Sequence, residues 1–134
     1  MARAQAALLA GFGLILGACG PRDFRVGGTI TIASHLQARA PKQNCVLFIV
    51  AKNLGGVPLA VKRIVNPSFP ASFTLGTEDL VVPDTHPRDP LRLEIEMNTH
   101  GNVGSPVRGD LLGKYPDPVR SGDKRINVVI DRQL

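Results

Sequence analysis

The alternation of apolar and polar side chains is the main structural signal in this chain. It is strictest in residues 91–97, LRLEIEM, where every odd position is apolar and the even positions are Arg92, Glu94 and Glu96. A period of two residues predicts a β-strand with one buried face and one face in water, as in an antiparallel sheet. We therefore expect these three charged side chains to be exposed to solvent.

Six other short segments are rich in branched and aromatic residues, which favour strands. The predicted strands are residues 28–33, 46–51, 59–65, 72–75, 109–112 and 125–131. The run at 46–51, VLFIVA, is apolar on both faces, so it should lie in the interior of the structure. A connection containing Gly55 and Gly56 joins it to the next strand, which predicts a β-hairpin. Single helical turns are expected at 34–40, capped by Ser34, and at 77–80.

Seven short strands with turns between them and almost no helix predict an all-β fold, an antiparallel β-sandwich. The 14 glycines and 11 prolines agree with short strands joined by turns. The formal net charge of +5 comes from interspersed basic and acidic residues without a clustered basic stripe, so nucleic acid is not expected as a partner. An Arg-Gly-Asp sequence at 108–110 is interpreted as a turn that enters a strand.

Residues 1–18 have the pattern of a secretory signal peptide. Arg3 precedes an uncharged run that is shorter than the roughly 20 residues needed to span a membrane. Residues 16–19, LGAC, resemble the bacterial lipobox, so Cys19 is the expected site of lipid attachment. The mature chain would then start at Cys19 and residues 19–27 would form a tether. Gly20 after the cysteine favours a periplasmic protein anchored in the outer membrane rather than the inner membrane.

Few side chains offer candidate chemistry. Cys45 is the one thiol besides Cys19, and its place at the start of an apolar strand predicts a small buried residue, with a reactive thiol or an intermolecular disulfide left open. His35, His86 and His100 lack the i, i+4 or i, i+2 spacing of metal ligands. The chain contains no G-x-S-x-G, P-loop or H-E-x-x-H motif. We therefore expect no enzyme activity, no cofactor and no metal.

Five segments taken together resemble a known family. They are GTITIA at 28–33, VLFIVAKNLGGVPLAVKR at 46–63, FPASFTLGTEDLVVP at 69–83, RGDLLG at 108–113 and INVVID at 126–131. In this order they resemble the carboxy-terminal periplasmic domain of CycH-type cytochrome c biogenesis proteins. The resemblance implies that the sandwich is immunoglobulin-like (Ig-like), and we expect it to occupy residues 28–134.

The expected function combines the leader with the resemblance. It is an exported bacterial lipoprotein that serves as a non-enzymatic binding or assembly module, with an accessory role in c-type cytochrome biogenesis. Its expected partners are the membrane, through the lipid anchor at Cys19, and, as the resemblance implies, apocytochrome c or heme-ligation components. Gly55, Gly56, Lys62 and Arg63 are candidate partner-binding residues, or else ordinary exposed residues of a hairpin. The alternative function is an envelope structural or interaction lipoprotein that keeps the sandwich and is unrelated to heme delivery.

Overall fold

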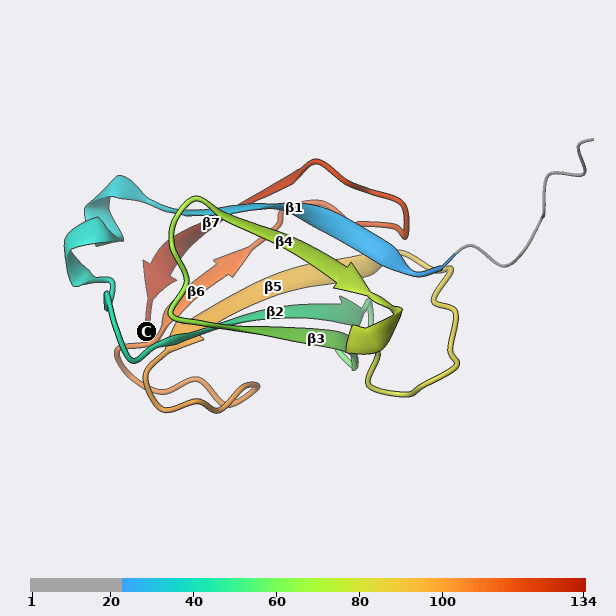
Figure 1. Ribbon diagram of the computed structural model, residues 1–134, viewed down its shortest axis with the longest axis horizontal. Helices are drawn as coiled ribbons and strands as arrows, with labels where there is room; N and C mark the ends of the chain where they lie inside the picture. The colour runs from blue at the N-terminus through green and yellow to red at the C-terminus, as the bar shows by residue number, and fades with distance from the viewer. Residues whose placement is uncertain (1–22) are drawn as a thin grey trace, which may run out of the picture.

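Seven β-strands and two short 3₁₀ helices make up the computed structural model, which describes residues 23–134 (Figure 1). The elements in chain order are β1 (Arg25–Ile32), η1 (Ser34–Arg39), β2 (Val46–Asn53), β3 (Pro58–Val65), β4 (Ala71–Gly76), η2 (Thr77–Asp79), β5 (Leu91–Asn98), β6 (Leu111–Lys114) and β7 (Ile126–Gln133). The all-β prediction is confirmed. The predicted signal peptide and the lipid site Cys19 lie outside the described residues.

The strands form one sheet in the order β3-β2-β5-β6-β7-β1-β4. This sheet folds over on itself, so that its two edge strands, β3 and β4, come close to each other (Figure 1). The predicted antiparallel pairing is correct for every neighbouring pair except β1 and β7, which are parallel. A parallel pair needs a long connection between its strands, and here most of the chain lies between them.

The core is built from alternate residues of the strands. In β5 the four apolar residues of the LRLEIEM segment are each only 1% exposed, as the alternation predicted. β2 lies between β3 and β5 in the sheet and is buried on both faces, since Ile49 and its neighbour Val50 are both buried. This interior position was also predicted.

The polar face of β5 is less exposed than the alternation predicted. Arg92 is exposed, but Glu94 is half-buried and Glu96 is only 7% exposed. The loop between β5 and β6 covers Glu96, and the backbone N–H of Gly104 in this loop donates to its carboxylate at 3.0 Å. The prediction for Glu96 was therefore wrong, because the loop that follows β5, which has no part in the strand pattern, supplies both the cover and the hydrogen bond.

Every strand differs from its predicted bounds by one to three residues at one end or both, and the starts of β1 and β6 differ most. β1 begins at Arg25 instead of residue 28, and Phe24 and Val26 are already buried in the core, so the predicted tether 19–27 overlaps the folded body. β6 begins at Leu111 instead of residue 109, because Gly109 has a φ of +99° and belongs to the preceding turn. Packing in the core thus extends β1, whereas the turn at Gly109 delays the start of β6.

The helical turns lie where they were predicted, but their ends differ. Ala33 is the N-cap of η1, and no side chain caps this helix, so the predicted capping role of Ser34 was wrong. The buried side chain of Leu36 holds η1 against the core instead. In η2 the carboxylate of Asp79 accepts a hydrogen bond from the Gly76 N–H at 2.8 Å, which closes the turn after β4.

Candidate functional site

The two glycines predicted to contact a partner lie in the turn between β2 and β3. Both are exposed, and Gly56 has a φ of +89°, a conformation that glycine adopts readily. Asn53 stabilises the turn: its carbonyl accepts from the Gly56 N–H and its side chain accepts from the Val57 N–H, each at 2.9 Å. The turn is therefore a well-ordered exposed feature, and its role in partner binding stays a prediction.

The other two predicted partner residues, Lys62 and Arg63, are neighbours in the edge strand β3. Lys62 Nζ donates to the carbonyl of Thr74 in β4 at 2.8 Å and lies 3.4 Å from the Asp79 carboxylate. Arg63 is exposed. Because successive side chains of a strand point to opposite faces, the two residues do not form one surface. Lys62 connects the two edges of the sheet, whereas Arg63 remains available to a partner.

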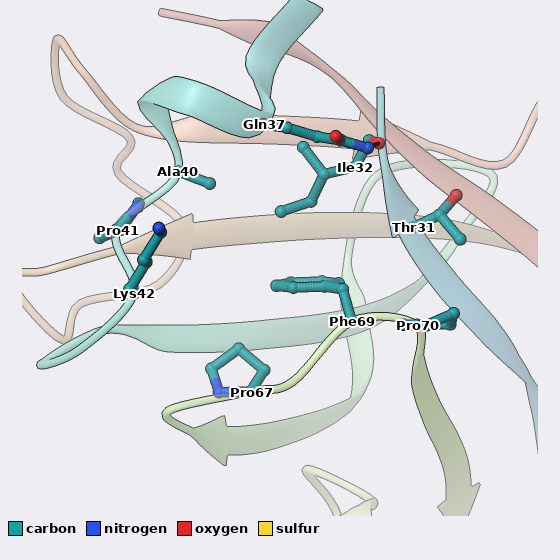
Figure 2. A pocket seen from close by; sticks show the side chains of 9 residues that line it. All are labelled: Thr31, Ile32, Gln37, Ala40, Pro41, Lys42, Pro67, Phe69 and Pro70. Carbon is teal, nitrogen blue, oxygen red and sulfur yellow. Dashed lines mark hydrogen bonds between the residues drawn. The ribbon is translucent and has the colours of Figure 1, made fainter. Parts of the chain in front are cut away.

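A cavity of about 450 Å³ lies at the end of the sandwich where β1 finishes (Figure 2). Six of its nine lining residues are apolar, and they come from β1, the segment after η1 and the connection from β3 to β4: Ile32, Ala40, Pro41, Pro67, Phe69 and Pro70. Thr31, Gln37 and Lys42 are the polar residues of the lining. This volume falls within the range of about 300–1,000 Å³ that is usual for ligand sites.

The walls of this cavity are fixed by contacts behind them. Asn66, at the start of one wall, exchanges hydrogen bonds with Cys45: its N–H donates to the Cys45 carbonyl at 2.8 Å, and its side-chain oxygen accepts from the Cys45 N–H at 3.2 Å. The Cys45 thiol in turn donates to the carbonyl of Pro41 in the other wall, with a distance of 3.6 Å between sulfur and oxygen. Phe69 and Ile32 also pack against the core. The cavity is therefore preformed.

Cys45 is the free cysteine of the described residues and is only 1% exposed, so the predicted burial is confirmed. Burial raises the pKa of this thiol above its ordinary value, because a thiolate would lose its solvation in the core. A raised pKa and lack of access both reduce reactivity. Cys45 thus supports the cavity walls from behind and does not line the cavity.

Sequence reasoning did not find the cavity. Its apolar residues come from three segments that are separated in the chain, and none of them has a recognisable motif. The prolines at positions 41, 67 and 70 are the one signal that marks these segments, and prolines most often indicate only turns. The folding of the sheet brings the three segments together.

His100 and Asp110 form the one close pair of a histidine and a carboxylate among residues 23–134, with 2.7 Å between Nε2 and Oδ2. The Asn102 N–H donates to His100 Nδ1 at 3.2 Å, so Nε2 carries the hydrogen that is donated to Asp110. Asp110 is buried and also accepts from the Val107 N–H at 2.9 Å. Both ring nitrogens and the carboxylate are thus used to hold the loop between β5 and β6.

Within residues 23–134 no group of three or more His, Cys, Asp or Glu side chains is arranged to hold a metal ion. The same part of the chain contains no helix with the length and apolar character needed to cross a membrane.

Comparisons with known proteins identify the family. An uncharacterized protein of Aquifex aeolicus (strain VF5) is 29% identical over 108 residues, which are 80% of this chain and 70% of that protein. No solved structure matches the chain. Residues 26–131 match the cytochrome c-type biogenesis protein H Ig-like domain, a family linked to cytochrome c biogenesis. These residues cover almost the whole described fold, and the chain therefore belongs to the cytochrome c-type biogenesis protein H Ig-like domain family.

Proposed function

We propose that this protein is a lipid-anchored, non-enzymatic binding module with an accessory role in c-type cytochrome biogenesis. The observation that carries the proposal is the family match over residues 26–131, which includes most or all of each of the seven strands. In this proposal Cys19 bears the lipid, the protein stays on the periplasmic side of the outer membrane, and its partners are apocytochrome c or components of the heme-ligation machinery.

The cavity is the surface we assign to the partner. It lies beside Ile32, at the end of β1, whereas the chain enters the sandwich at Arg25, at the other end of the strand (Figure 1). Seven steps of about 3.3 Å give roughly 23 Å between these two ends. At most about 14 Å of extended chain can separate Cys19 from residue 23. A lipid at Cys19 would therefore hold the opposite end of the sandwich near the membrane and leave the cavity facing the periplasm.

The contacts of the His100–Asp110 pair and of Cys45 support a non-enzymatic role. A general base needs a free nitrogen or oxygen within reach of a substrate proton. Both nitrogens of His100 and the Asp110 carboxylate are already engaged in holding a loop. Cys45, the one free thiol of the described residues, is buried. The cavity contributes a lysine, a threonine and a glutamine to an otherwise apolar lining, which suits binding.

A deletion strain tests the role in cytochrome maturation. We expect a lower amount of heme-stained c-type cytochromes without a loss of their transcripts, and restoration by the intact gene. A Thr31→Trp variant, which places a large ring at the cavity, should restore less holo-cytochrome than Ser72→Trp, a matched change at an exposed position of β4. Normal heme staining in the deletion strain would refute this function and favour the envelope structural alternative.

The anchor is tested separately by cell fractionation. The unaltered protein should sediment with outer membranes and incorporate labelled palmitate. The Cys19→Ser protein should do neither. If the variant still sediments with membranes, the lipid anchor at Cys19 is wrong, whatever the outcome for cytochrome maturation.

A further inference from the structure

We propose that the cavity binds a carboxylate that stands next to an apolar side chain on a polypeptide partner, with Lys42 as its counter-ion. This inference rests on the proposed function, because it specifies what the binding module recognises. It is argued from three features of the cavity: its apolar lining, its single cation and the apolar surface beside it.

The apolar part of the ligand would lie between Ile32, Phe69 and Pro67. Figure 2 shows the side chains of Ile32 and Phe69 directed into the same space from opposite sides, with the ring of Pro67 below them. Ile32 and Phe69 are only partly buried although they pack against the core, so part of their apolar surface stays in water until a ligand covers it. Covering apolar surface contributes roughly 25 cal/mol per Å². This part of the site selects an aromatic or branched side chain.

The charged part of the ligand would lie beside Lys42. This is the one charged residue that lines the cavity, and Figure 2 shows its Nζ turned toward the interior of the cavity. Among residues 23–134 Lys42 forms no salt bridge, unlike Lys52, Lys62 and Lys114. Lys42 is exposed, and its attraction for a carboxylate would become stronger when the bound partner excludes water from the ammonium group, because the effective dielectric constant is then lower. The site therefore distinguishes a carboxylate from a neutral amide.

The surroundings favour a polypeptide over a small free acid. Val65, at the end of β3, is 55% exposed, so an exposed apolar side chain stands two positions before Pro67 of the cavity lining. A small acid would fill the cavity and leave Val65 uncovered. A chain that leaves the cavity would cover it and would also pass near the exposed Arg63 in the same strand. The Thr31 hydroxyl and the amide oxygen of Gln37 can bond to the backbone of such a chain, while the Gln37 amide nitrogen already donates to the Ile32 carbonyl at 3.4 Å.

The test measures the binding of a dye-labelled tetrapeptide ending in leucine and phenylalanine to the full chain in nonionic detergent, by fluorescence anisotropy. We expect the peptide with a free carboxyl terminus to bind at least 10-fold more tightly than its carboxyl-terminal amide. Lys42→Gln should reduce the binding of the acid to that of the amide. Lys124→Gln, a change at an exposed lysine at the other end of the sandwich, should leave the binding of both peptides unchanged.

Three results would overturn the inference. The acid and the amide could bind equally well, Lys42→Gln could have no effect, or 3-phenylpropionate could compete at the same concentration as the peptide, which would indicate a site for small acids. The outcome is separable from the proposed function. Loss of holo-cytochrome in the deletion strain, rescued fully by Lys42→Gln, would keep the function and reject the carboxylate site. Selective peptide binding together with normal cytochrome maturation in the deletion strain would keep the carboxylate site and reject the proposed function.

Discussion

Replacement of Lys62 by methionine should loosen the contact between the two edges of the sheet. The change keeps an unbranched side chain of similar length and removes the ammonium group. That group donates to the Thr74 carbonyl at 2.8 Å and lies 3.4 Å from the Asp79 carboxylate. β3 and β4 have no paired register with each other, so this side chain is a direct polar connection between them.

The expected loss of unfolding free energy is about 1 kcal/mol. A hydrogen bond from a charged group contributes roughly 1.5–3 kcal/mol when it is shielded from water. The Lys62 side chain is 30% exposed and Thr74 is exposed, so water can replace part of the lost bond. The partly exposed ion pair adds less than about 1 kcal/mol. Asp79 still accepts from the Gly76 N–H in the variant, so η2 should persist.

Urea unfolding followed by circular dichroism measures the effect, with Arg63→Met as the matched control. Arg63 is exposed and has no polar contact with another described residue, so its replacement should change the unfolding free energy by less than about 0.5 kcal/mol. Moderate salt should reduce the difference between the variants, because it screens the Lys62–Asp79 attraction. Equal losses for the two variants would refute the assignment of Lys62 to the edge contact. A confirmed difference would make Arg63 the better position for testing partner binding.

Four further predictions concern the interior. Gly28→Ala should lower the free energy of unfolding by about 3 kcal/mol or more, because a Cβ atom there would overlap the backbone of Ile126 in β7. Gly55→Ala in the exposed turn should lower it by less than about 1 kcal/mol. Equal urea midpoints for the two variants would contradict this prediction. Asp110→Ala should lower the free energy of unfolding by about 2 kcal/mol, since the N–H of Val107 and the ring N–H of His100 lose their acceptor. Replacement of the exposed Asp117 by alanine should leave stability nearly unchanged. An unchanged melting curve of the Asp110 variant would contradict this prediction. In the Cys19→Ser chain, Cys45 should react with iodoacetamide at least 100-fold more slowly in the folded than in the urea-unfolded protein, and rapid labelling of the folded chain would contradict its burial. Burial raises the pKa of Cys45, so above the ordinary thiol pKa the unfolded chain loses a proton that the folded chain keeps. The free energy of unfolding should therefore fall as the pH rises through this range. Cys45→Ala should reduce this loss of stability at alkaline pH.

The hairpin of β2 and β3 and the strand β5 could be predicted from sequence because their signals are local. A period of two residues states which side chains share a face, and the burial of Leu91, Leu93, Ile95 and Met97 follows it. A run that is apolar at every position, as in β2, indicates a strand that is buried on both faces. This holds whichever parts of the chain supply its neighbours. The order of the five family segments then indicated the Ig-like fold, which the match over residues 26–131 confirms.

The features that remained hidden all depend on contacts between distant segments. Glu96 is buried because a loop returns over β5 and offers it the Gly104 N–H, and the spacing of residues within a strand carries no information about such a loop. Lys62 was a candidate partner-binding residue, and the sequence did not indicate that the folding of the sheet brings Thr74 and Asp79 within its reach. The parallel pairing of β1 with β7 joins the two ends of the described chain in the same way.

The sequence alone determined the strands, the faces they bury and the family, because the alternation of side chains and the turn residues act over a few positions. The tertiary structure alone decided which charged residues are free and where a ligand could bind. Ile32, Lys42 and Phe69 line one cavity only because the sheet closes and brings the end of β1, the segment after η1 and the connection from β3 to β4 together. A binding site of this kind arises from the meeting of separate segments, so no single stretch of the chain can encode it.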